Sequence, residues 1–545
     1  MDRFAGLRDL PTKLRRLYWN GSERAACPTT VSRKTHMFNR AVVSRMEWKS
    51  DLMTYFLPSG YRERLDAASY FDAPGHLVYQ PHVYDLAAYL AERSGARYIV
   101  DIGCGSGAKL RAASQKFQII GIDGPHCLPL SRTNLPQAQL LEADLEKGVP
   151  ELDPGILKDA VVICADVVEH LRSPDGLLAD LARISAQCRF VLVSTLDRDR
   201  ARGIGSLGPP ANPAHVREWT ASEFHRLLCA TGFRQPFFLG HTVNTDFHAL
   251  KSTLLAISGR EASYQRPRRD VRVGAIVNVY NEEDMLPEVI RHLKQQRVSV
   301  HIVDNWSNDH SYEIAQRAQQ SGEVSSLRRF PAAPTAEYAW RRLLENSVRL
   351  STELDLDWVL HYDADEIRVS PWNGVTLTEA IGFADSLGYD AIDFTVIDFR
   401  FLKSCPAASP PYEHGLTHFQ FGRRPGHFAQ IKAWKQRGQV VDLWSSGGHS
   451  AAFEGRRVYP LKFLTKHYPL RTPQQARLKI FRDRLPRVGK ERELHGWHTH
   501  YDRFAESSEI IGWSKSELLQ WGRPTFDAEF LVERLSGIGI ERESG

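Results

Sequence analysis

The chain has 545 residues, of which 42% are hydrophobic and 25% are charged, and its formal net charge is +5. This length exceeds what one hydrophobic core usually organises, so we expect two or three domains. The composition is that of a globular protein and excludes a fibrous or wholly disordered chain. The seven cysteines include no Cys-x-x-Cys pair, which argues against a disulfide framework or a zinc knuckle and indicates a reducing, cytoplasmic setting.

Positive charge is concentrated near the N-terminus, where residues 1–50 contain 11 Lys and Arg against 4 Asp and Glu. We expect residues 1–70 to form a basic extension. It either packs on the first domain as a solvated segment or meets an anionic membrane surface, and nucleic acid is the less favoured partner. No stretch approaches 18 consecutive apolar residues, and charges stand where a signal peptide needs its apolar core. The sequence therefore predicts neither a transmembrane span nor secretion by that route.

Apolar segments of strand length alternate with helix-like segments over residues 71–255, which we interpret as the first domain. This alternation is typical of a parallel sheet covered by helices on both faces. The near-continuous apolar character of the strands suits burial on two sides. The predicted strands are Tyr98–Ile102, Gln118–Asp123, Ala138–Glu142, Ala160–Ala165 and Phe190–Thr195.

The first of these strands runs into a glycine-rich loop that begins at Asp101 and contains Gly103, Gly105 and Gly107. Glycine lets a backbone approach a nucleotide-like ligand closely, at the N-terminus of the helix that follows. The third glycine falls one position earlier than in the dinucleotide loop G-x-G-x-x-G, and Asp101 is placed to contact an amino-acid moiety. Both features argue against NAD.

Acidic residues end the next two strands. Asp123 is placed to accept hydrogen bonds from ribose hydroxyls, and Asp144 lies near the expected position of an adenine amino group. The segments DIGCGSG, IGID and EADLE resemble, in this order, the motifs of class I S-adenosylmethionine-dependent methyltransferases, and the resemblance covers roughly residues 75–240. It implies a Rossmann-like sheet that binds S-adenosylmethionine through Asp101, Gly103, Gly105, Gly107, Asp123 and Asp144.

The fourth strand ends in Asp166, Glu169 and His170, where this superfamily places residues that face the methyl group. Similar E-x-x-E-H and H-x-x-E-W segments hold a divalent metal in small-RNA 2′-O-methyltransferases and, more loosely, in ubiquinone-pathway O-methyltransferases, although Asp replaces the first Glu here. One interpretation is that these residues and His215 form a hard-metal or acid–base cluster that deprotonates a hydroxyl acceptor. The alternative is that Glu169 and His170 only fix the loop through hydrogen bonds.

A polar stretch that is rich in arginine then interrupts the pattern, and we expect a linker over residues 256–270. A second alternating series follows over residues 271–480 and predicts a second α/β domain. Residues 481–545 are rich in Arg, Trp and His with a helical period, so we expect a helical C-terminal extension. The strands predicted for the second domain start at Val273 and then occupy Val298–Val303, Trp358–Tyr362 and Ala391–Val396.

Asp363 and Asp365 belong to an Asp-x-Asp-Glu segment that directly follows an apolar strand. Carboxylates at such a sheet edge would hold Mn²⁺ or Mg²⁺ against a diphosphate. The NEE segment that begins at Asn281 and the DNWSND segment that begins at Asp304 end the two preceding strands. Together the three features resemble a family 2 type glycosyltransferase with the GT-A fold, over about residues 271–400. The resemblance implies inverting transfer from a nucleotide sugar, with Asp304 at the nucleobase and Asp363 and Asp365 at the metal.

The resemblance supplies no catalytic base beyond residue 400. Candidates there are Asp442, His449 and Glu454, followed by the Lys-His-Tyr segment at His467. We expect Glu454 to act as the base and His449 to complete the metal site, and an ordinary loop is the alternative for each residue. A set of basic residues either faces a phosphate of the substrate or is solvated, namely Lys403, Arg423, Arg424 and Lys432.

The sequence therefore predicts a bifunctional cytoplasmic enzyme. It would transfer a sugar from a nucleotide sugar to a glycan or lipid-linked acceptor and methylate a glycan or its precursor, as in surface polysaccharide or glycoconjugate biosynthesis. The alternative is an RNA or small-molecule O-methyltransferase whose second domain binds a glycan or a partner without catalysis. Retention on RNA that falls steeply with salt would favour an RNA substrate.

Overall fold

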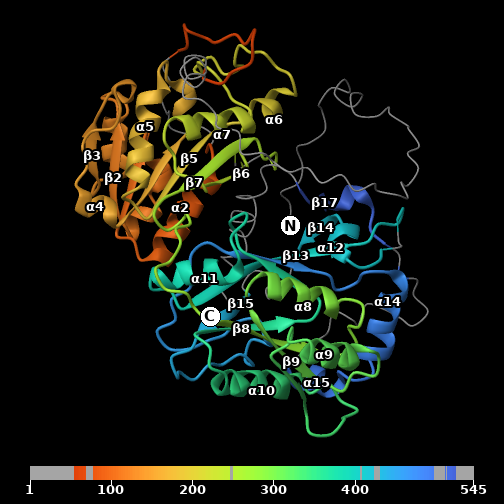
Figure 1. Cartoon of the computed structure of the whole chain (residues 1–545). Helices are drawn as coiled ribbons and strands as arrows, with labels where there is room; N and C mark the ends of the chain where they lie inside the picture. Colours follow the sequence, from red (N-terminus) through yellow and green to blue (C-terminus); the bar gives the residue numbers. More distant parts are fainter. Residues whose placement is uncertain are drawn as a thin grey trace, which may run out of the picture. The chain divides into compact units, whose positions relative to one another are not determined.

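The computed structural model describes residues 55–68, 78–245, 249–405, 408–422, 430–495, 510 and 512–522. Two separate α/β sheets are present in this part of the chain (Figure 1). The predicted basic extension lies mostly outside the described residues, as do Arg423 and Arg424. No described helix is long and apolar enough to span a bilayer.

The first sheet has seven strands in the order β3-β2-β1-β4-β5-β7-β6. Strands β1 to β5 are parallel, and β7 is antiparallel to both β5 and β6. The strands are β1 (Tyr98–Ile102), β2 (Gln118–Asp123), β3 (Gln139–Glu142), β4 (Ala160–Ala165), β5 (Phe190–Leu196), β6 (Phe238–Thr242) and β7 (Thr253–Ser258). The helices between them are α2 (Pro81–Ser94), α3 (Leu128–Asn134), α4 (Pro154–Lys158), α5 (Pro174–Ser185), α6 (Arg198–Arg202) and α7 (Ala221–Ala230).

The central strand β4 is buried along its whole length because helices cover both of its faces. Ile163 belongs to the same core cluster as Leu86 of α2, whereas its neighbour Val162 belongs to the cluster of Leu178 of α5. Successive side chains of a strand point to opposite faces, so a continuous apolar run serves two cores. The loops that follow β1, β2 and β4 consequently open at one edge of the sheet, where the first candidate site lies.

The second sheet has ten strands, and eight of them follow the order β10-β9-β8-β11-β15-β13-β14-β17, while β16 pairs with β12 and β13. Strands β8, β9 and β11 are parallel neighbours, so that their carboxyl ends share one edge. The strands are β8 (Val273–Val279), β9 (Ser299–Asp304), β10 (Ser326–Arg329), β11 (Trp358–Asp363), β12 (Glu366–Val369), β13 (Ala391–Arg400), β14 (His418–Phe421), β15 (Ile431–Lys435), β16 (Phe463–His467) and β17 (Leu519–Gln520). The helices are α8 (Leu286–Gln295), α9 (Ser311–Gln320), α10 (Trp340–Glu353), α11 (Leu377–Ser386) and α12 (Tyr412–Gly415).

Two boundaries differ from the sequence expectation. Strand β7 continues to Ser258, so the first sheet includes residues that were expected in the linker. The C-terminal part contains α14 (Pro473–Arg477), a π-helix at Leu478–Arg484 and α15 (Gly489–His495), but it also contributes β17, which pairs with β14. The C-terminal extension is therefore partly a strand of the second sheet.

Candidate functional sites

The glycine loop after β1 has a backbone that only glycine adopts easily. Gly103, Gly105 and Gly107 have φ angles of 83°, 54° and 71°. A Cβ atom at Gly103 would lie 2.3 Å from Cγ2 of Val167, and one at Gly107 would lie 2.6 Å from Cδ1 of Leu135. The loop is thus packed against its neighbours on one side, and its backbone is exposed to the cavity on the other.

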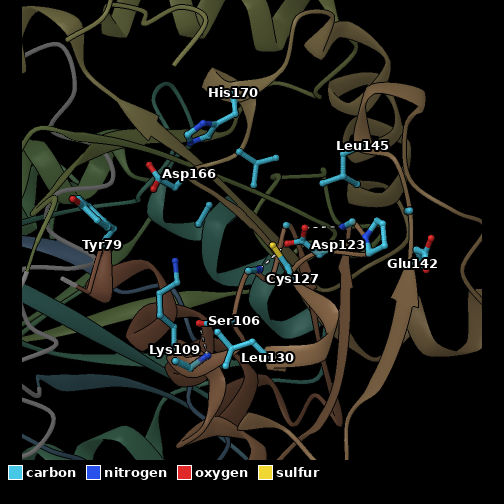
Figure 2. Close-up of a pocket in the computed structure, with 18 of the residues that line it drawn as sticks. Tyr79, Ser106, Lys109, Asp123, Cys127, Leu130, Glu142, Leu145, Asp166 and His170 are labelled. Carbon is cyan, nitrogen blue, oxygen red and sulfur yellow. Dashed lines mark hydrogen bonds between the residues drawn. The ribbon is translucent and has the colours of Figure 1, made fainter. Parts of the chain in front are cut away.

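A cavity of about 750 Å³ lies against this loop and the carboxyl ends of β2, β3 and β4 (Figure 2). Its volume suits a ligand of nucleoside size. The predicted site residues that line it are Gly103, Gly105, Asp123, Asp144, Asp166 and His170. Lining residues that were not predicted include Tyr79 and Lys109, which stand in no motif, and Glu142, which begins the EADLE segment.

The predicted ligand-binding acids differ in their surroundings. Oδ2 of Asp123 accepts a hydrogen bond from the backbone N–H of Gly105 and Oδ1 accepts one from Gly124, both at 2.7 Å. Each carboxylate oxygen keeps lone pairs for further donors. Asp144 is exposed at the cavity and caps the 3₁₀ turn that follows β3. Asp101, in contrast, is 1% exposed, accepts a hydrogen bond from the Tyr84 hydroxyl at 3.2 Å and is not among the lining residues.

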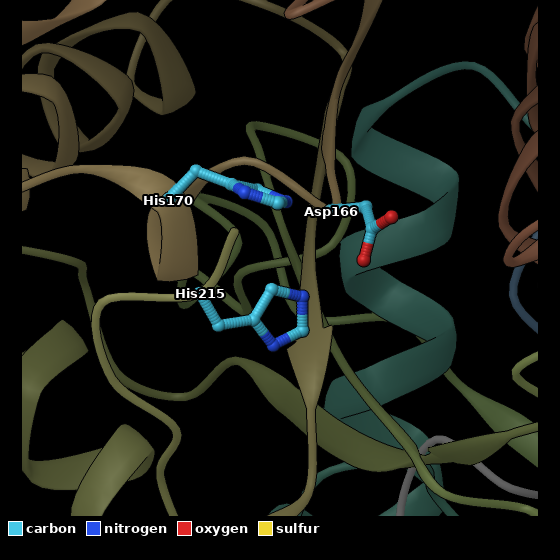
Figure 3. Close-up of side chains that lie close together, drawn as sticks. All are labelled: Asp166, His170 and His215. Atoms are coloured by element: carbon cyan, nitrogen blue, oxygen red, sulfur yellow. The ribbon is translucent and has the colours of Figure 1, made fainter. Parts of the chain in front are cut away.

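Three ligand-type side chains converge at the end of β4 (Figure 3). One ligand atom each from Asp166, His170 and His215 lies within 4.8 Å of the others. Asp166 has a φ angle of 63°, which is unusual for a residue with a Cβ atom, and its Oδ1 accepts a hydrogen bond from Nε2 of Gln80 at 2.9 Å. Strained backbone of this kind concentrates at functional sites.

Hydrogen bonds orient both imidazole rings of this group. Nδ1 of His170 lies 2.9 Å from the carbonyl oxygen of Ala214, which can only accept, so Nδ1 carries the proton and Nε2 the lone pair. Nδ1 of His215 lies 3.0 Å from Oε1 of the buried Glu218. A carboxylate behind a histidine is the usual partner of a metal-ligating imidazole. Glu218 was not predicted as a site residue, although the H-x-x-E spacing contains the signal.

Glu169 adds a fourth group and is fully buried. Neither of its carboxylate oxygens has a hydrogen-bond partner among the described residues. Burial and the nearby Asp166 raise the pKa of Glu169 well above its usual range, which favours its protonated form. Oxygen and imidazole ligands with a buried, unpaired acid beside them fit a divalent cation.

The second candidate site begins at Asp304, which ends β9 and is almost fully buried. Burial raises the pKa of Asp304, while the backbone N–H of Ser307 and the guanidinium of Arg329 oppose this effect. The Arg329 guanidinium lies over the rings of Tyr312 and Trp306, at 3.7 Å and 4.6 Å from their centroids. An acid beside aromatic faces is suited to a nucleobase.

Asp363 ends β11 and Asp365 follows it, and each contacts a buried lysine. Nζ of Lys432 lies 2.6 Å from Oδ2 of Asp363, and Nζ of Lys479 lies 2.7 Å from Oδ2 of Asp365. The two lysine side chains are only 4% and 8% exposed. Burial favours a raised pKa for Asp365, but Lys479 and His467 hold its pKa well below the usual range. The alternative that Lys432 is solvated is therefore wrong.

His467 contacts the second aspartate of the Asp-x-Asp segment. Its Nε2 lies 3.5 Å from Oδ2 of Asp365 and its Nδ1 lies 2.8 Å from Oδ1 of Asp398. Burial opposes protonation, but the two carboxylates raise the pKa of His467 to about 10. His449 is exposed and lies 2.8 Å from Nε2 of Gln430, and Glu454 is exposed as well. The metal-completing role expected of His449 and the role of base expected of Glu454 stay predictions.

Comparison with known proteins identifies domains in both halves of the chain. A family model described as a methyltransferase domain matches residues 67–235, and one described as glycosyl transferase family 2 matches residues 275–347. The ubiquinone biosynthesis O-methyltransferase of Sodalis glossinidius (strain morsitans) is 28% identical over 142 residues. The match covers 24% of this chain and 56% of that relative, so the chain spans little more than half the relative's length.

Three solved structures are similar to part of the chain. The methyltransferase domain of bacterial CtHen1-CN is 18% identical, with coverage of 33% of this chain and 98% of that one and a TM-score of 0.26. The N-terminal domain of EvdMO1 with SAH bound is 20% identical, with 41% and 99% coverage and a TM-score of 0.26. A SAM-dependent methyltransferase from Aquifex aeolicus is 17% identical, with 34% and 93% coverage and a TM-score of 0.25. These likenesses do not bear on the substrate of this chain.

The two family matches fall on the two sheets, one on each. They confirm the tandem α/β fold and both resemblances that the sequence predicted. The chain therefore contains a methyltransferase domain followed by a glycosyl transferase family 2 domain.

Proposed function

We propose that the chain is a bifunctional enzyme that methylates a hydroxyl group and transfers a sugar from a nucleotide sugar, in surface polysaccharide or glycoconjugate biosynthesis. The observation that carries the methylation half is the convergence of Asp166, His170 and His215 beside the cofactor cavity. Oxygen nucleophiles need a base or a cation to become reactive, whereas the sulfonium donor is already activated. The free thiols of the six described cysteines support a cytoplasmic location.

In this proposal S-adenosylmethionine occupies the cavity along the glycine loop. Gly103 and Gly105 bring backbone close to the amino-acid end, Asp123 accepts from the ribose hydroxyls, and Asp144 lies at the adenine side. Asp101 would act indirectly, because it is buried and accepts a hydrogen bond from the Tyr84 hydroxyl. Alignment of the methyl group with the acceptor oxygen is then the main contribution of the protein.

The acceptor hydroxyl would lie at the end of β4. Asp166, His170 and His215 would hold a divalent cation there, and such a cation would lower the pKa of a bound hydroxyl. Glu169 lies beside the group as a second carboxyl, and Glu218 fixes the ring of His215. With its proton held on Nδ1 by the Ala214 carbonyl, His170 offers Nε2 as the alternative acceptor for the hydroxyl proton.

The methylation half is tested by metal removal. Chelator-treated protein should lose methyl transfer to hydroxyl acceptors and regain it with Mg²⁺ or Mn²⁺, while its affinity for S-adenosylhomocysteine stays the same. Asp166→Ala should remove activity in the presence of metal as well. Full methyl transfer in chelator would contradict the requirement for a metal, and His170 would then be the proposed base.

The sugar-transfer half is an inverting displacement at the anomeric carbon, with Asp304 at the nucleobase. It is supported by the family match and by the acid and aromatic side chains at the end of β9. A panel of nucleotide sugars, tested for hydrolysis and for thermal stabilisation, should reveal one preferred donor. If none stabilises wild-type protein more than it stabilises Asp304→Ala, this half of the proposal fails.

A second candidate function is favoured by the lysine contacts at Asp363 and Asp365. In that case the second domain binds a glycan or a partner without catalysis, and the first domain methylates an RNA or a small molecule. Salt-dependent retention on RNA, together with no hydrolysis of any nucleotide sugar, would select this alternative.

A further inference from the structure

The Asp-x-Asp segment already holds a cation on each of its aspartates. Lys432 reaches from β15 and donates to Oδ2 of Asp363 at 2.6 Å and to Oε1 of Glu366 at 3.2 Å. The pairing is intramolecular and buried, and burial of an ammonium group is favourable only when carboxylates compensate its charge. The position in which a divalent cation would touch Asp363 is therefore next to a fixed positive charge.

The second aspartate is held by the C-terminal segment. Lys479 lies in the π-helix Leu478–Arg484 and donates to Oδ2 of Asp365 and to Oε1 of Glu282, both at 2.7 Å. A π-helical turn is rare and occurs often at functional sites, because the extra residue redirects a side chain. This segment thus inserts an ammonium group between the acids at the ends of β8 and β11.

The surrounding charges balance without a metal. Six carboxylates around this segment form two groups of ion pairs, and each carboxylate has a basic side chain within 4.0 Å. The two groups together contain six basic side chains, besides His361, which lies near Asp363 and whose pKa is lowered to about 3 by burial. The acids are Glu282, Asp284, Asp363, Asp365, Glu366 and Asp398, and their partners are Arg368, Arg400, Lys432, His467, Arg471 and Lys479.

The first site shows the opposite pattern. Asp166 accepts from the neutral amide of Gln80, and no lysine or arginine pairs with it among the described residues. Within the described part of the chain, a group of three or more potential metal ligands is found only at Asp166, His170 and His215. The residues at the first site fit a divalent cation, and those at Asp363 and Asp365 do not.

We propose that the second domain binds the diphosphate of its donor without a divalent metal, because Lys432 and Lys479 occupy the place of the cation at Asp363 and Asp365. This inference rests on the proposed use of a nucleotide sugar. An ammonium group has three N–H donors, and each lysine uses two of them on carboxylates. One donor on each side chain is left for a phosphate oxygen.

The test measures Mn²⁺ binding and nucleoside diphosphate binding separately. Full-length protein with Asp166→Ala and His215→Ala, which lacks the first site, is titrated with Mn²⁺ by electron paramagnetic resonance. Uridine, guanosine, adenosine and cytidine diphosphates are titrated calorimetrically into the same protein, in EDTA and in Mn²⁺. We expect no Mn²⁺ bound up to the millimolar range and the same affinity for the preferred diphosphate in both buffers.

Variants link the result to the two lysines. Lys479→Met should weaken diphosphate binding in EDTA at least tenfold and create a Mn²⁺ site that restores it, whereas Lys479→Arg should bind in EDTA like the parent. Lys462→Met is the matched control, because Lys462 is a buried lysine that pairs with Asp393 at 2.7 Å away from the Asp-x-Asp segment. It should change neither measurement. The melting temperature of each variant identifies any that fails to fold.

Mn²⁺ binding by the parent protein that disappears in Asp365→Asn, or a tenfold gain in diphosphate affinity with Mn²⁺, would overturn the inference. Absence of diphosphate binding in both buffers is a different result. It would contradict the proposed use of a nucleotide sugar, while the Mn²⁺ titration would still decide whether the lysines exclude the metal.

Discussion

At the scale of single residues, the proposed metal site would depend on a side chain that does not line the cavity. Glu218 is buried and contacts Nδ1 of His215, so its charge sets the tautomer and the orientation of that ring. Loss of such a partner typically lowers metal affinity about 10–100-fold. Glu218→Gln keeps the size of the side chain and removes only the charge.

We therefore expect Glu218→Gln to weaken Mn²⁺ binding and methyl transfer by about 10–100-fold. Its affinity for S-adenosylhomocysteine should match that of wild-type protein, because Glu218 is not among the cavity-lining residues. Isothermal titration with each ligand measures both effects. Equal Mn²⁺ affinity in the two proteins would contradict the role given to Glu218.

Two glycine positions distinguish the effect of backbone strain on stability from the effect of the loop's shape on ligand binding. Gly103 and Gly95 both have positive φ angles, 83° and 70°. A Cβ atom at Gly103 would meet Val167 at 2.3 Å, whereas one at Gly95 would meet nothing within 4 Å. Gly95→Ala should cost about 1 kcal/mol of stability and leave S-adenosylhomocysteine binding intact. Gly103→Ala should in addition weaken the affinity for S-adenosylhomocysteine at least tenfold. Comparable affinity in the two variants would show that this shape of the loop is not required for binding.

At the scale of elements, strand β9 positions Asp304 and contains a buried histidine. Burial, together with Arg328, lowers the pKa of His301 to about 4, and its Nδ1 lies 2.9 Å from the Ser326 hydroxyl on β10. A histidine with a depressed folded pKa binds its proton more readily in the unfolded state. The contribution of His301 to the free energy of unfolding is therefore fully present above pH 6.5 and is lost as the pH falls toward 4.

Replacement of His301 should make the free energy of unfolding depend less strongly on pH below pH 6.5. His301→Gln should lose less stability than wild-type protein between pH 6.5 and 4, by at most about 3 kcal/mol. Urea unfolding across this range measures the difference, and above pH 7 the two curves should run parallel. Identical slopes below pH 6.5 would mean that His301 does not titrate with folding.

The local pattern of the sequence was sufficient for the strands whose ends line the first cavity. Strands β1, β2, β4 and β5 are mostly apolar runs that end at or next to a glycine or an acid, so both their burial and their cavity-facing ends could be predicted. The edge strand β3 also ends at the cavity, but its residues are exposed or half-buried. Strands β6 and β7 escaped prediction because they end in no motif and return antiparallel to β5. The contacts of Lys432 and Lys479 also escaped, because these lysines lie 69 and 114 residues from their aspartate partners and stand in no motif. The contact of His467 with Asp365 escaped for the same reason.

At the scale of the whole molecule, one chain would carry a metal-dependent and a metal-independent transferase. EDTA should then reduce methyl transfer at least tenfold while leaving nucleoside diphosphate affinity unchanged in the same sample. The physical reason is that no lysine or arginine among the described residues pairs with Asp166, whereas Asp363 and Asp365 each pair with a lysine. Parallel loss of both functions in EDTA would contradict this division.

The most direct test of two donor sites in one polypeptide is a calorimetric titration of S-adenosylhomocysteine and of the preferred nucleoside diphosphate into the full chain, alone and together. The account predicts one site for each ligand, with neither affinity changed by the other. Asp123→Ala should remove only the first ligand and Asp304→Ala only the second, so each variant controls for the folding of the other. Competition between the ligands, or loss of both in a single variant, would contradict the account.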